Sequence, residues 1–98
     1  MTTDEMAELF EKHEDSEYLQ FDRVANKLSK RADLHAFMVI DRLFPNTSST
    51  YIIGGASHDE ICLSVDRENF AEVATEELII ELTRCGVIFD GYSFNMHV

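Results

Sequence analysis

The stretch TEELIIELTRCGVIFDGYSFNMHV, residues 75–98, predicts a helix followed by a tight β-hairpin. Thr75 is a favourable N-cap for a helix over Glu76–Cys85, which a glycine ends. The pair Asp90-Gly91 lies between β-rich flanks and predicts a two-residue hairpin turn. Many small DNA-binding domains carry a recognition helix directly before such a hairpin, which is then called the wing. What this helix can bind is therefore the first functional question.

Helical periodicity divides residues 76–85 into two faces. The inward face is predicted to hold Leu78, Ile79, Leu82 and Cys85. The outward face is predicted to hold Glu76, Glu77, Ile80, Glu81 and Arg84. Three acids against one base match phosphates poorly, although acids in a first turn also stabilise a helix through its dipole. Ile80 either contacts another part of the chain or solvent, or anchors a partner-binding surface.

Further helices and short strands are predicted upstream. Thr2 and Glu5 form a capping-box pattern for an acidic helix over 2–13, whose apolar stripe is Met6, Leu9 and Phe10. Residues 18–33 form either an irregular segment or a second helix. Asp33 is a good N-cap for a helix that ends near Pro45, and because this helix is apolar nearly all round we expect it to be the central buried one.

Two β-rich pieces follow, Tyr51–Ile53 and Ile61–Val65, before Asp66 caps a short helix. The sequence therefore predicts a single α+β domain over 1–98, with helices packed on a small antiparallel sheet and helix 2–13 packed on the rest. From residue 32 onward the order of elements matches a winged-helix domain. A more generic α+β domain fits the same pattern equally well.

Length and composition favour a domain that folds without staples. The chain has 98 residues, of which 45% are hydrophobic, and this is enough for a core without metal or disulfides. Two distant cysteines, Cys62 and Cys85, indicate a reducing compartment with buried, unligated thiols. No signal peptide precedes the first acids, and no apolar run is long enough to span a bilayer, so we expect a cytoplasmic protein.

The charge is strongly negative and unevenly distributed. The formal net charge is −11. Residues 1–22 hold eight acids and one base, residues 23–45 hold five bases and two acids, and residues 46–98 hold nine acids and two bases. Such a surface repels nucleic acid and anionic lipid and favours basic protein partners. The alternative is that the negative charge only keeps a small protein soluble.

No pattern predicts a catalytic, metal or cofactor site. His58 and Cys62 share one strand face, but zinc sites usually need four ligands in tight pairs, and no such pairs occur. The segment IIGGASH lacks the residues of a phosphate loop and of a dinucleotide fingerprint. A Cys–His nucleophilic pair has no local support. We therefore expect no enzyme activity, no metal and no cofactor.

The one basic cluster lies in the segment RVANKLSKR. It comprises Arg23, Lys27, Lys30 and Arg31. A nucleic-acid patch would need more bases and interleaved aromatic residues. Acidic segments flank the cluster on both sides, so a salt-bridged belt against the first helix is the favoured interpretation.

Four segments resemble a known family. They are FEKHEDSEYLQFDRV, NKLSKRADLHAF, HDEICLSVD and ATEELIIELTRCGV. Together they resemble a family of short acidic proteins of unknown function that is associated with bacteriophages and prophages. The resemblance implies no activity and no site residues. It favours a protein that binds and blocks a host protein, as small acidic phage proteins often do.

We therefore expect a non-enzymatic acidic binding protein that acts in the host cytoplasm. It would be a phage-encoded inhibitor or modulator of a host defence or nucleic-acid-handling protein. It would act by protein contact or by nucleic-acid mimicry. The predicted partner-binding residues are Asp4, Glu5, Glu8, Glu11, Glu76, Glu77, Ile80 and Glu81. The expected partner is a host protein with a basic surface, with no direct DNA binding and no membrane contact; a homodimer stays open. The alternative is a winged-helix-like transcriptional regulator or dimerisation module, with any DNA contact made by residues 23–31.

Overall fold

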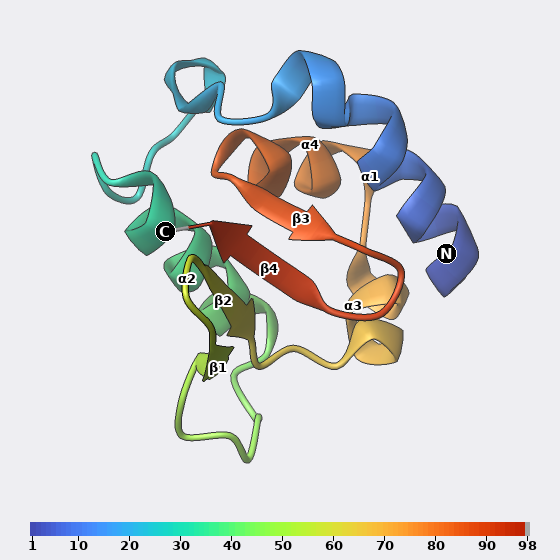
Figure 1. Ribbon diagram of the computed structural model, residues 1–98, viewed down its shortest axis with the longest axis vertical. Helices are drawn as coiled ribbons and strands as arrows, with labels where there is room; N and C mark the ends of the chain where they lie inside the picture. The colour runs from blue at the N-terminus through green and yellow to red at the C-terminus, as the bar shows by residue number, and fades with distance from the viewer. Residues whose placement is uncertain (98) are drawn as a thin grey trace.

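The computed structural model describes residues 1–97 and shows an α+β fold, as the sequence predicts. Its elements in chain order are α1 (Thr3–Glu17), the 3-10 turn η1 (Phe21–Arg23), α2 (Ala32–Leu43), β1 (Ile53–Ala56), β2 (Glu60–Leu63), α3 (Arg67–Val73), α4 (Glu76–Arg84), β3 (Val87–Phe89) and β4 (Phe94–His97). The four strands form one sheet in the order β1-β2-β4-β3 (Figure 1). All neighbouring strands are antiparallel.

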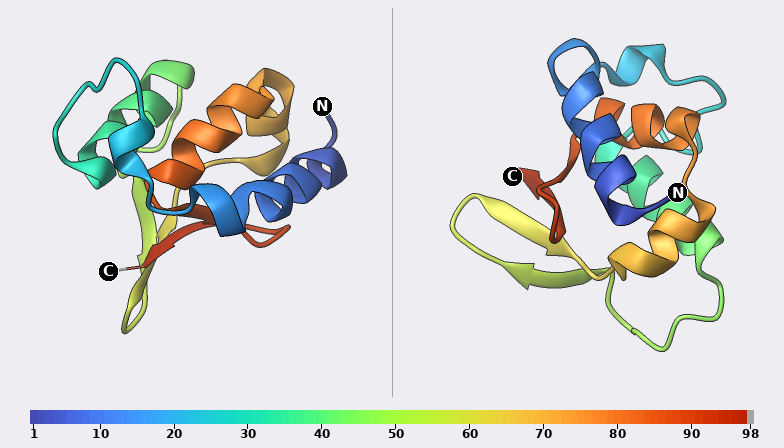
Figure 2. Two further views of the ribbon diagram at one scale, coloured as in Figure 1. Left: turned by 90° about the horizontal axis from the view of Figure 1, so that it is seen from above. Right: turned by 90° about the vertical axis from the view of Figure 1, so that its right-hand side faces the viewer.

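The helices cover one face of the sheet. In Figure 1 the sheet lies in front of α2 and α4. Strand alternation places Val87 opposite Met96, and Phe89 opposite Phe94, on the covered face, where all four side chains are buried. The β1–β2 hairpin extends beyond the helices in both views of Figure 2, and every residue of β1 is exposed.

The core joins this covered face to α1, α3 and α4. Its largest fully buried side chains include Met6, Phe70, Ile79, Leu82 and Phe94. The rings of Phe70 and Phe94 lie 4.7 Å apart between centroids, at a tilted angle. Because each such side chain contributes about 1.5–3 kcal/mol on burial, α1, which supplies Met6, is part of the folding unit rather than an appendage.

The order α2–β2–α3–α4–β3–β4 agrees with the winged-helix order expected from residue 32 onward. The strand pairing also agrees, because β4 lies between β2 and β3. In this comparison α4 takes the place of the recognition helix and β3–β4 that of the wing. Helix α1 and strand β1 are additional to that pattern.

Three of the four predicted N-caps, Thr2, Asp66 and Thr75, are confirmed, and Asp33 is the exception. Thr2 and Glu5 form both hydrogen bonds of a capping box at the start of α1. The Asp66 side chain accepts two backbone N–H groups at the start of α3, and Thr75 accepts one at the start of α4. After α4, Gly86 has φ +96°, a left-handed conformation that favours glycine.

Several predicted boundaries are wrong. Helix α1 continues to Glu17 instead of ending at residue 13, because ion pairs to the rest of the chain hold its last turn. Residues 18–31 are irregular apart from η1, one of the two alternatives. Helix α2 begins at Ala32, so Asp33 lies in its first turn, and no side chain caps it. α2 buries one face only; α4 is the helix that the rest of the chain surrounds.

The first strand lies later than predicted. β1 spans Ile53–Ala56, with a register shift between Ile53 and Gly55 where it pairs with β2. A Cβ on Gly54 would lie 3.4 Å from the Cβ of Ser64, so the glycine allows the close approach of these two segments. The absence of a side chain at Gly54 therefore allows β1 to pair with β2 across this irregularity.

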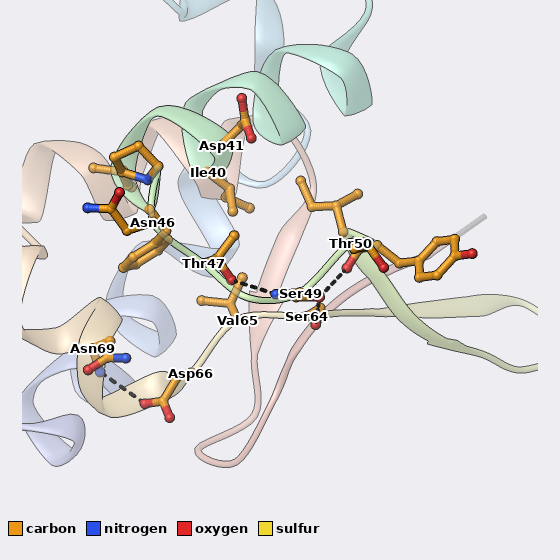
Figure 3. Close-up of a pocket in the computed structure, with 15 residues that line it drawn as sticks. Ile40, Asp41, Asn46, Thr47, Ser49, Thr50, Ser64, Val65, Asp66 and Asn69 are labelled. Atoms are coloured by element: carbon orange, nitrogen blue, oxygen red, sulfur yellow. Dashed lines mark hydrogen bonds between the residues drawn. The ribbon is translucent and has the colours of Figure 1, made fainter.

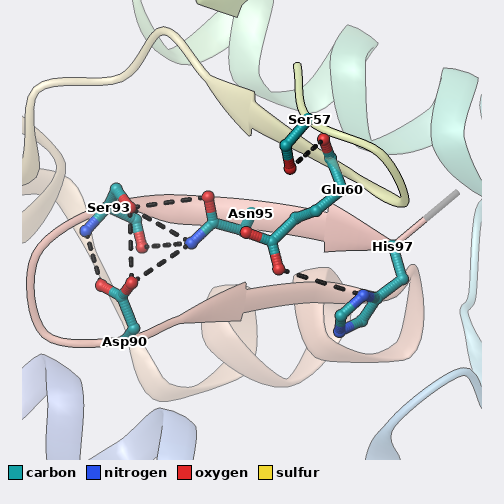
Figure 4. Close-up of polar contacts among 6 residues, drawn as sticks. All are labelled: Ser57, Glu60, Asp90, Ser93, Asn95 and His97. Carbon is teal, nitrogen blue, oxygen red and sulfur yellow. Dashed lines mark hydrogen bonds and ion pairs between the residues drawn. The ribbon is translucent and has the colours of Figure 1, made fainter. Parts of the chain in front are cut away.

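The hairpin turn is shifted by one residue from the predicted Asp90-Gly91. The Asp90 N–H donates to the Ser93 carbonyl at 3.3 Å, so Gly91 and Tyr92 form the tip. The Asp90 carboxylate accepts the N–H groups of Tyr92 and Ser93. Figure 4 shows the bond from Ser93 and the contact of the carboxylate with Asn95 Nδ2 at 3.4 Å. The backbone hydrogen bond from Ser93 is the largest cause that holds the pKa of Asp90 below its ordinary value, and the bond from Tyr92 acts in the same direction.

Candidate functional site

Helix α4, the predicted binding helix, is enclosed on most sides. It packs against α1, β3 and η1, and its Glu81 reaches α2. Of its nine residues only Glu77 is exposed. The predicted inward residues are buried, except that Leu78 is half-buried, and Thr83 is an additional buried residue whose hydroxyl donates to the Ile79 carbonyl.

Glu76, predicted to face outward, contacts α1. Its Oε2 lies 2.8 Å from His13 Nε2 and 3.4 Å from Lys12 Nζ. The hydrogen bond with His13, together with the charge of Lys12, holds the pKa of Glu76 below its ordinary value. This carboxylate therefore remains ionised while it joins α4 to α1.

Arg84, at the other end of the same row, contacts the end of α1. Its Nε donates to Glu17 Oε2, and its Nη1 donates to the Arg23 carbonyl at 3.2 Å. Glu17 also accepts from Arg23 Nη1 at 3.1 Å. The hydrogen bond from Arg84 is the main cause that lowers the pKa of Glu17.

Ile80 lies between Glu76 and Arg84 on this row, since the three residues are spaced by four. Both neighbours turn toward α1, and Ile80 is half-buried. The row is therefore a seam between α4 and α1, which we call the α1–α4 seam (Glu76, Ile80, Arg84 with Lys12, His13, Glu17). The contact of Ile80 with another part of the chain, one of the alternatives from sequence, agrees with this position.

The predicted acids of α1 lie differently. Asp4, Glu5, Glu8 and Glu11 are all exposed. Glu5 closes the capping box, and its hydrogen bond from the Thr2 backbone lowers its pKa. The other three belong to a straight row with a fourth acid that the sequence analysis did not include. We call this outer acidic row Asp4, Glu8, Glu11 and Asp15.

At about 100° per residue the outer acidic row lies opposite the buried stripe of Met6 and Phe10. Each of its four residues is exposed, and within residues 1–97 no Lys, Arg or His nitrogen lies within 4.0 Å of their carboxylates. The structure thus separates the predicted site residues into an enclosed group on α4 and an open group on α1. Asp15 was missed because the helix was predicted to end at residue 13.

The basic segment partly forms the predicted belt. Arg23 pairs with Glu17 at the end of α1. Lys27 Nζ donates to the Val24 carbonyl at 2.8 Å and lies 5.3 Å from the centroid of the Phe21 ring. Lys30 and Arg31 are exposed. Two of the four bases therefore hold the irregular segment in place instead of forming a continuous basic surface.

A pocket of 530 Å³ lies at the C-terminal end of α2, and Figure 3 shows its lining. One wall is the end of α2, and the others are the segment 45–52 and the connection from β2 to α3. Seven aliphatic or aromatic side chains, Pro45 and Tyr51 included, lie among hydroxyl, amide and carboxylate groups, and the lining contains no His, Lys, Arg or Cys. The pocket thus offers hydroxyl and amide groups, which can donate or accept hydrogen bonds, and the negative charge of two carboxylates.

Both edges of the sheet carry a feature that limits pairing with another strand. At β3, α1 packs alongside, and Val87 and Phe89 are buried. At β1, the register shift after Ile53 interrupts the ladder, and β1 is only four residues long. Short and bulged edges are common protections against edge-to-edge association.

The two cysteines differ from each other. Cys85 is buried, and burial, with the charge of Glu81, raises the pKa of its thiol to about 12. Cys62 is half-buried on the open face of the sheet, so the expectation that both are buried is wrong for Cys62. Within residues 1–97 no three His, Cys, Asp or Glu side chains lie together as a metal site would require. No helix in the same range is both long and apolar enough to cross a bilayer.

Comparison with known proteins adds no family. No family model, no curated protein and no solved structure matches this chain.

Proposed function

We propose that the protein is a non-enzymatic binding protein whose outer acidic row on α1 occupies a basic, phosphate-binding groove of a partner protein. The observation that supports this proposal is that Asp4, Glu8, Glu11 and Asp15 form one exposed row and make no ion pair with another residue of the described range 1–97. Of the other acids of the predicted site, Glu5, Glu76 and Glu81 interact within the chain, whereas Glu77 is exposed.

The outer acidic row lowers the stability of α1, and solubility alone does not require like charges in one row. Asp4 and Glu8, and Glu11 and Asp15, are like charges four residues apart, and Glu8 and Glu11 are three apart. Each such pair destabilises a helix by about 0.2–0.5 kcal/mol. The last turn of α1 contains no base, so its acids also oppose the helix dipole. Scattered charges would keep the protein soluble without these penalties.

A partner's groove that binds phosphates recognises negative charge, and the linear array of carboxylates on α1 offers that charge. Consecutive members of the row rise by about 4.5–6 Å along the helix axis. Long-range attraction to a basic surface accelerates encounter, and occupation of the groove excludes its nucleic acid. Inhibition of the partner is the expected consequence, in agreement with a phage inhibitor of a host defence or nucleic-acid-handling protein.

The test is affinity capture from a lysate of the native host, followed by competition with duplex DNA. Wild-type protein is expected to retain a basic protein that duplex DNA releases. Glu8→Lys with Glu11→Lys is expected to lose this capture. The matched control is Glu68→Lys with Glu72→Lys, which makes the same charge change at two exposed positions of α3. Equal loss in both variants would show that only net charge matters and would contradict the proposal.

A second candidate, a winged-helix-like regulator, is favoured by the strand order β2-β4-β3 and the helix pair before it. The α1–α4 seam argues against DNA reading by α4, because α1 covers the row that would enter a groove. Removal of α1 would also remove Met6 and Phe10 from the core. We expect no binding of duplex DNA at physiological salt in a mobility-shift titration. Submicromolar binding with a steep salt dependence would favour the regulator instead.

A further inference from the structure

The pocket at the end of α2 has a negative electrostatic character that comes from the backbone as well as from side chains. The last carbonyls of a helix lack helical partners and carry the negative end of its dipole. The partner of the Asp41 carbonyl would be the N–H of residue 45, which is Pro45 and has none. The Thr47 N–H bonds to the Phe44 carbonyl, not to that of Leu43. Among residues 1–97 no loop N–H pairs with the carbonyls of Asp41 and Leu43.

Two carboxylates of the lining add charge. Asp41 is exposed and forms no ion pair with another described residue. Asp66 caps α3 through Oδ1, which leaves its second oxygen without a backbone donor. The base in the last turn of α2, Arg42, is exposed and does not line the pocket. No cation of the lining offsets the carboxylates and the helix end.

The floor of the pocket is apolar. Its side chains include Ile40, Leu43, Phe44, Ile52 and Val65. All except Ile40, which is buried, are half-buried. An apolar floor below hydroxyl, amide and carboxylate groups suits a ligand with an apolar stem and a polar head.

Two aromatic rings complete the lining. Phe44 is half-buried at the end of α2, and Tyr51 is 77% exposed at the mouth. Aromatic faces attract cations by about 0.5–1 kcal/mol at exposed sites. The largely exposed Tyr51 ring beside the apolar floor is also an available contact surface for such a head group.

We propose that this pocket binds an organic cation, an ammonium or guanidinium group on an apolar stem. The stem lies on the floor of Ile40, Phe44 and Val65, and the head donates to the carbonyls at the α2 end and to Asp41. A lysine or arginine side chain of a basic partner and a free alkylamine share this chemistry. An anion is opposed by the same groups, and a neutral alkyl chain leaves the carbonyls of Asp41 and Leu43 unpaired.

The experiment is an NMR titration of the isotope-labelled full chain with n-butylguanidinium, with butyramide and butyrate as neutral and anionic probes of similar size. Butylguanidinium is expected to saturate, with a dissociation constant on the order of millimolar for so small a ligand. The amide shifts should concentrate in residues 40–52 and 64–69. Butyramide should bind at least about tenfold more weakly, and butyrate more weakly still.

Asp41→Asn should weaken butylguanidinium binding by about three- to tenfold, the range of one or two exposed charge pairs. Asp33→Asn is the matched control, because it makes the same change in the first turn of the same helix and lies outside the pocket. It should leave binding unchanged. Equal binding of butyramide and butylguanidinium, or equal effects of the two variants, would overturn the proposal.

A second arm distinguishes the source of the cation and keeps this proposal separate from that for α1. A capped Ala-Arg-Ala peptide that binds at least about tenfold more tightly than butylguanidinium assigns the pocket to a partner's side chain, and equal affinity assigns it to free amines. Glu8→Gln with Glu11→Gln should leave both affinities unchanged while it weakens partner capture. Loss of peptide binding in that variant would show that the cation lies on α1, and the pocket proposal would fall.

Discussion

His35 and Glu81 form a hydrogen bond between α2 and α4 whose donor is determined by a third group. The Leu28 N–H donates to His35 Nδ1 at 3.0 Å, so the ring proton lies on Nε2 and points to Glu81 Oε2 at 3.1 Å. The His35 side chain is 2% exposed and that of Glu81 35%. Glu81, predicted from the sequence to meet a partner, thus satisfies a buried donor of its own chain.

The first prediction concerns this hydrogen bond. Glu81→Leu leaves the buried Nε2–H without an acceptor and should lower the free energy of unfolding by about 1–3 kcal/mol. Glu81→Gln retains an acceptor oxygen and should cost less than about 1 kcal/mol. Urea unfolding measures both. Glu77→Leu and Glu77→Gln, at the exposed residue of the same helix, are the controls and should differ little from each other. Equal losses in Glu81→Leu and Glu81→Gln would contradict the role given to the bond.

The second prediction concerns Ile80. Its place in the α1–α4 seam predicts that Ile80→Ala lowers the free energy of unfolding by about 1–2 kcal/mol, less than the 2–5 kcal/mol of a fully buried isoleucine. Val73→Ala, at a valine 44% exposed on α3, should change stability by about 0.5 kcal/mol or less. Should Ile80→Ala leave melting unchanged, the isoleucine would be available to a partner, as the sequence first suggests.

Local signals explain which parts of the fold were predictable. The hydrogen bonds of Thr2, Asp66 and Thr75 join residues two or three apart, so the sequence contains both partners. The left-handed conformation of Gly86 follows from the residue type in the same way. The order of elements from residue 32 onward follows from such signals, because each one marks where an element begins or ends.

Long-range contacts explain the rest. Glu17 and Arg84 are 67 residues apart, and their pairing keeps the last turn of α1 helical where periodicity fades. The contacts between α4 and α1 also enclose Glu76 and Ile80. A helical wheel of α4 alone does not include α1 and therefore assigns both residues to solvent. Asp4, Glu8 and Glu11 of the outer acidic row are among the residues named from the sequence, whereas Asp15 lies beyond the predicted end of the helix. The pocket at the end of α2 is lined by residues from 40–52 and from 64–69. Because these segments are distant in the sequence, no local sequence pattern predicts the pocket.

The third prediction distinguishes the two thiols. Cys62 is half-buried and should react with a thiol reagent in the native protein, whereas Cys85 should react only on unfolding. Burial raises the pKa of Cys85 to about 12, so the reactive thiolate is scarce near neutral pH even where the reagent can enter. Counting labelled residues by peptide mapping at short times measures this. Cys62→Ser should leave the native chain almost unlabelled, and rapid labelling of Cys85 in that variant would contradict the buried position.

The last prediction concerns pH. The hydrogen bond from Arg84 lowers the pKa of Glu17 in the folded protein, so its contribution to stability is complete above the ordinary glutamate pKa and disappears as pH falls through the lowered one. Glu17→Gln should therefore melt at a lower temperature than wild type near pH 7, and this difference should narrow as the pH falls below the ordinary glutamate pKa and through the lowered pKa of Glu17. Glu14→Gln is the control, because Glu14 is exposed in the same last turn and forms no ion pair with a described residue. Its melting temperature should stay close to that of wild type at both pH values. A difference for Glu17→Gln that stays constant or widens at low pH would show that the carboxylate acts through packing, and the α1–α4 seam would not depend on its charge.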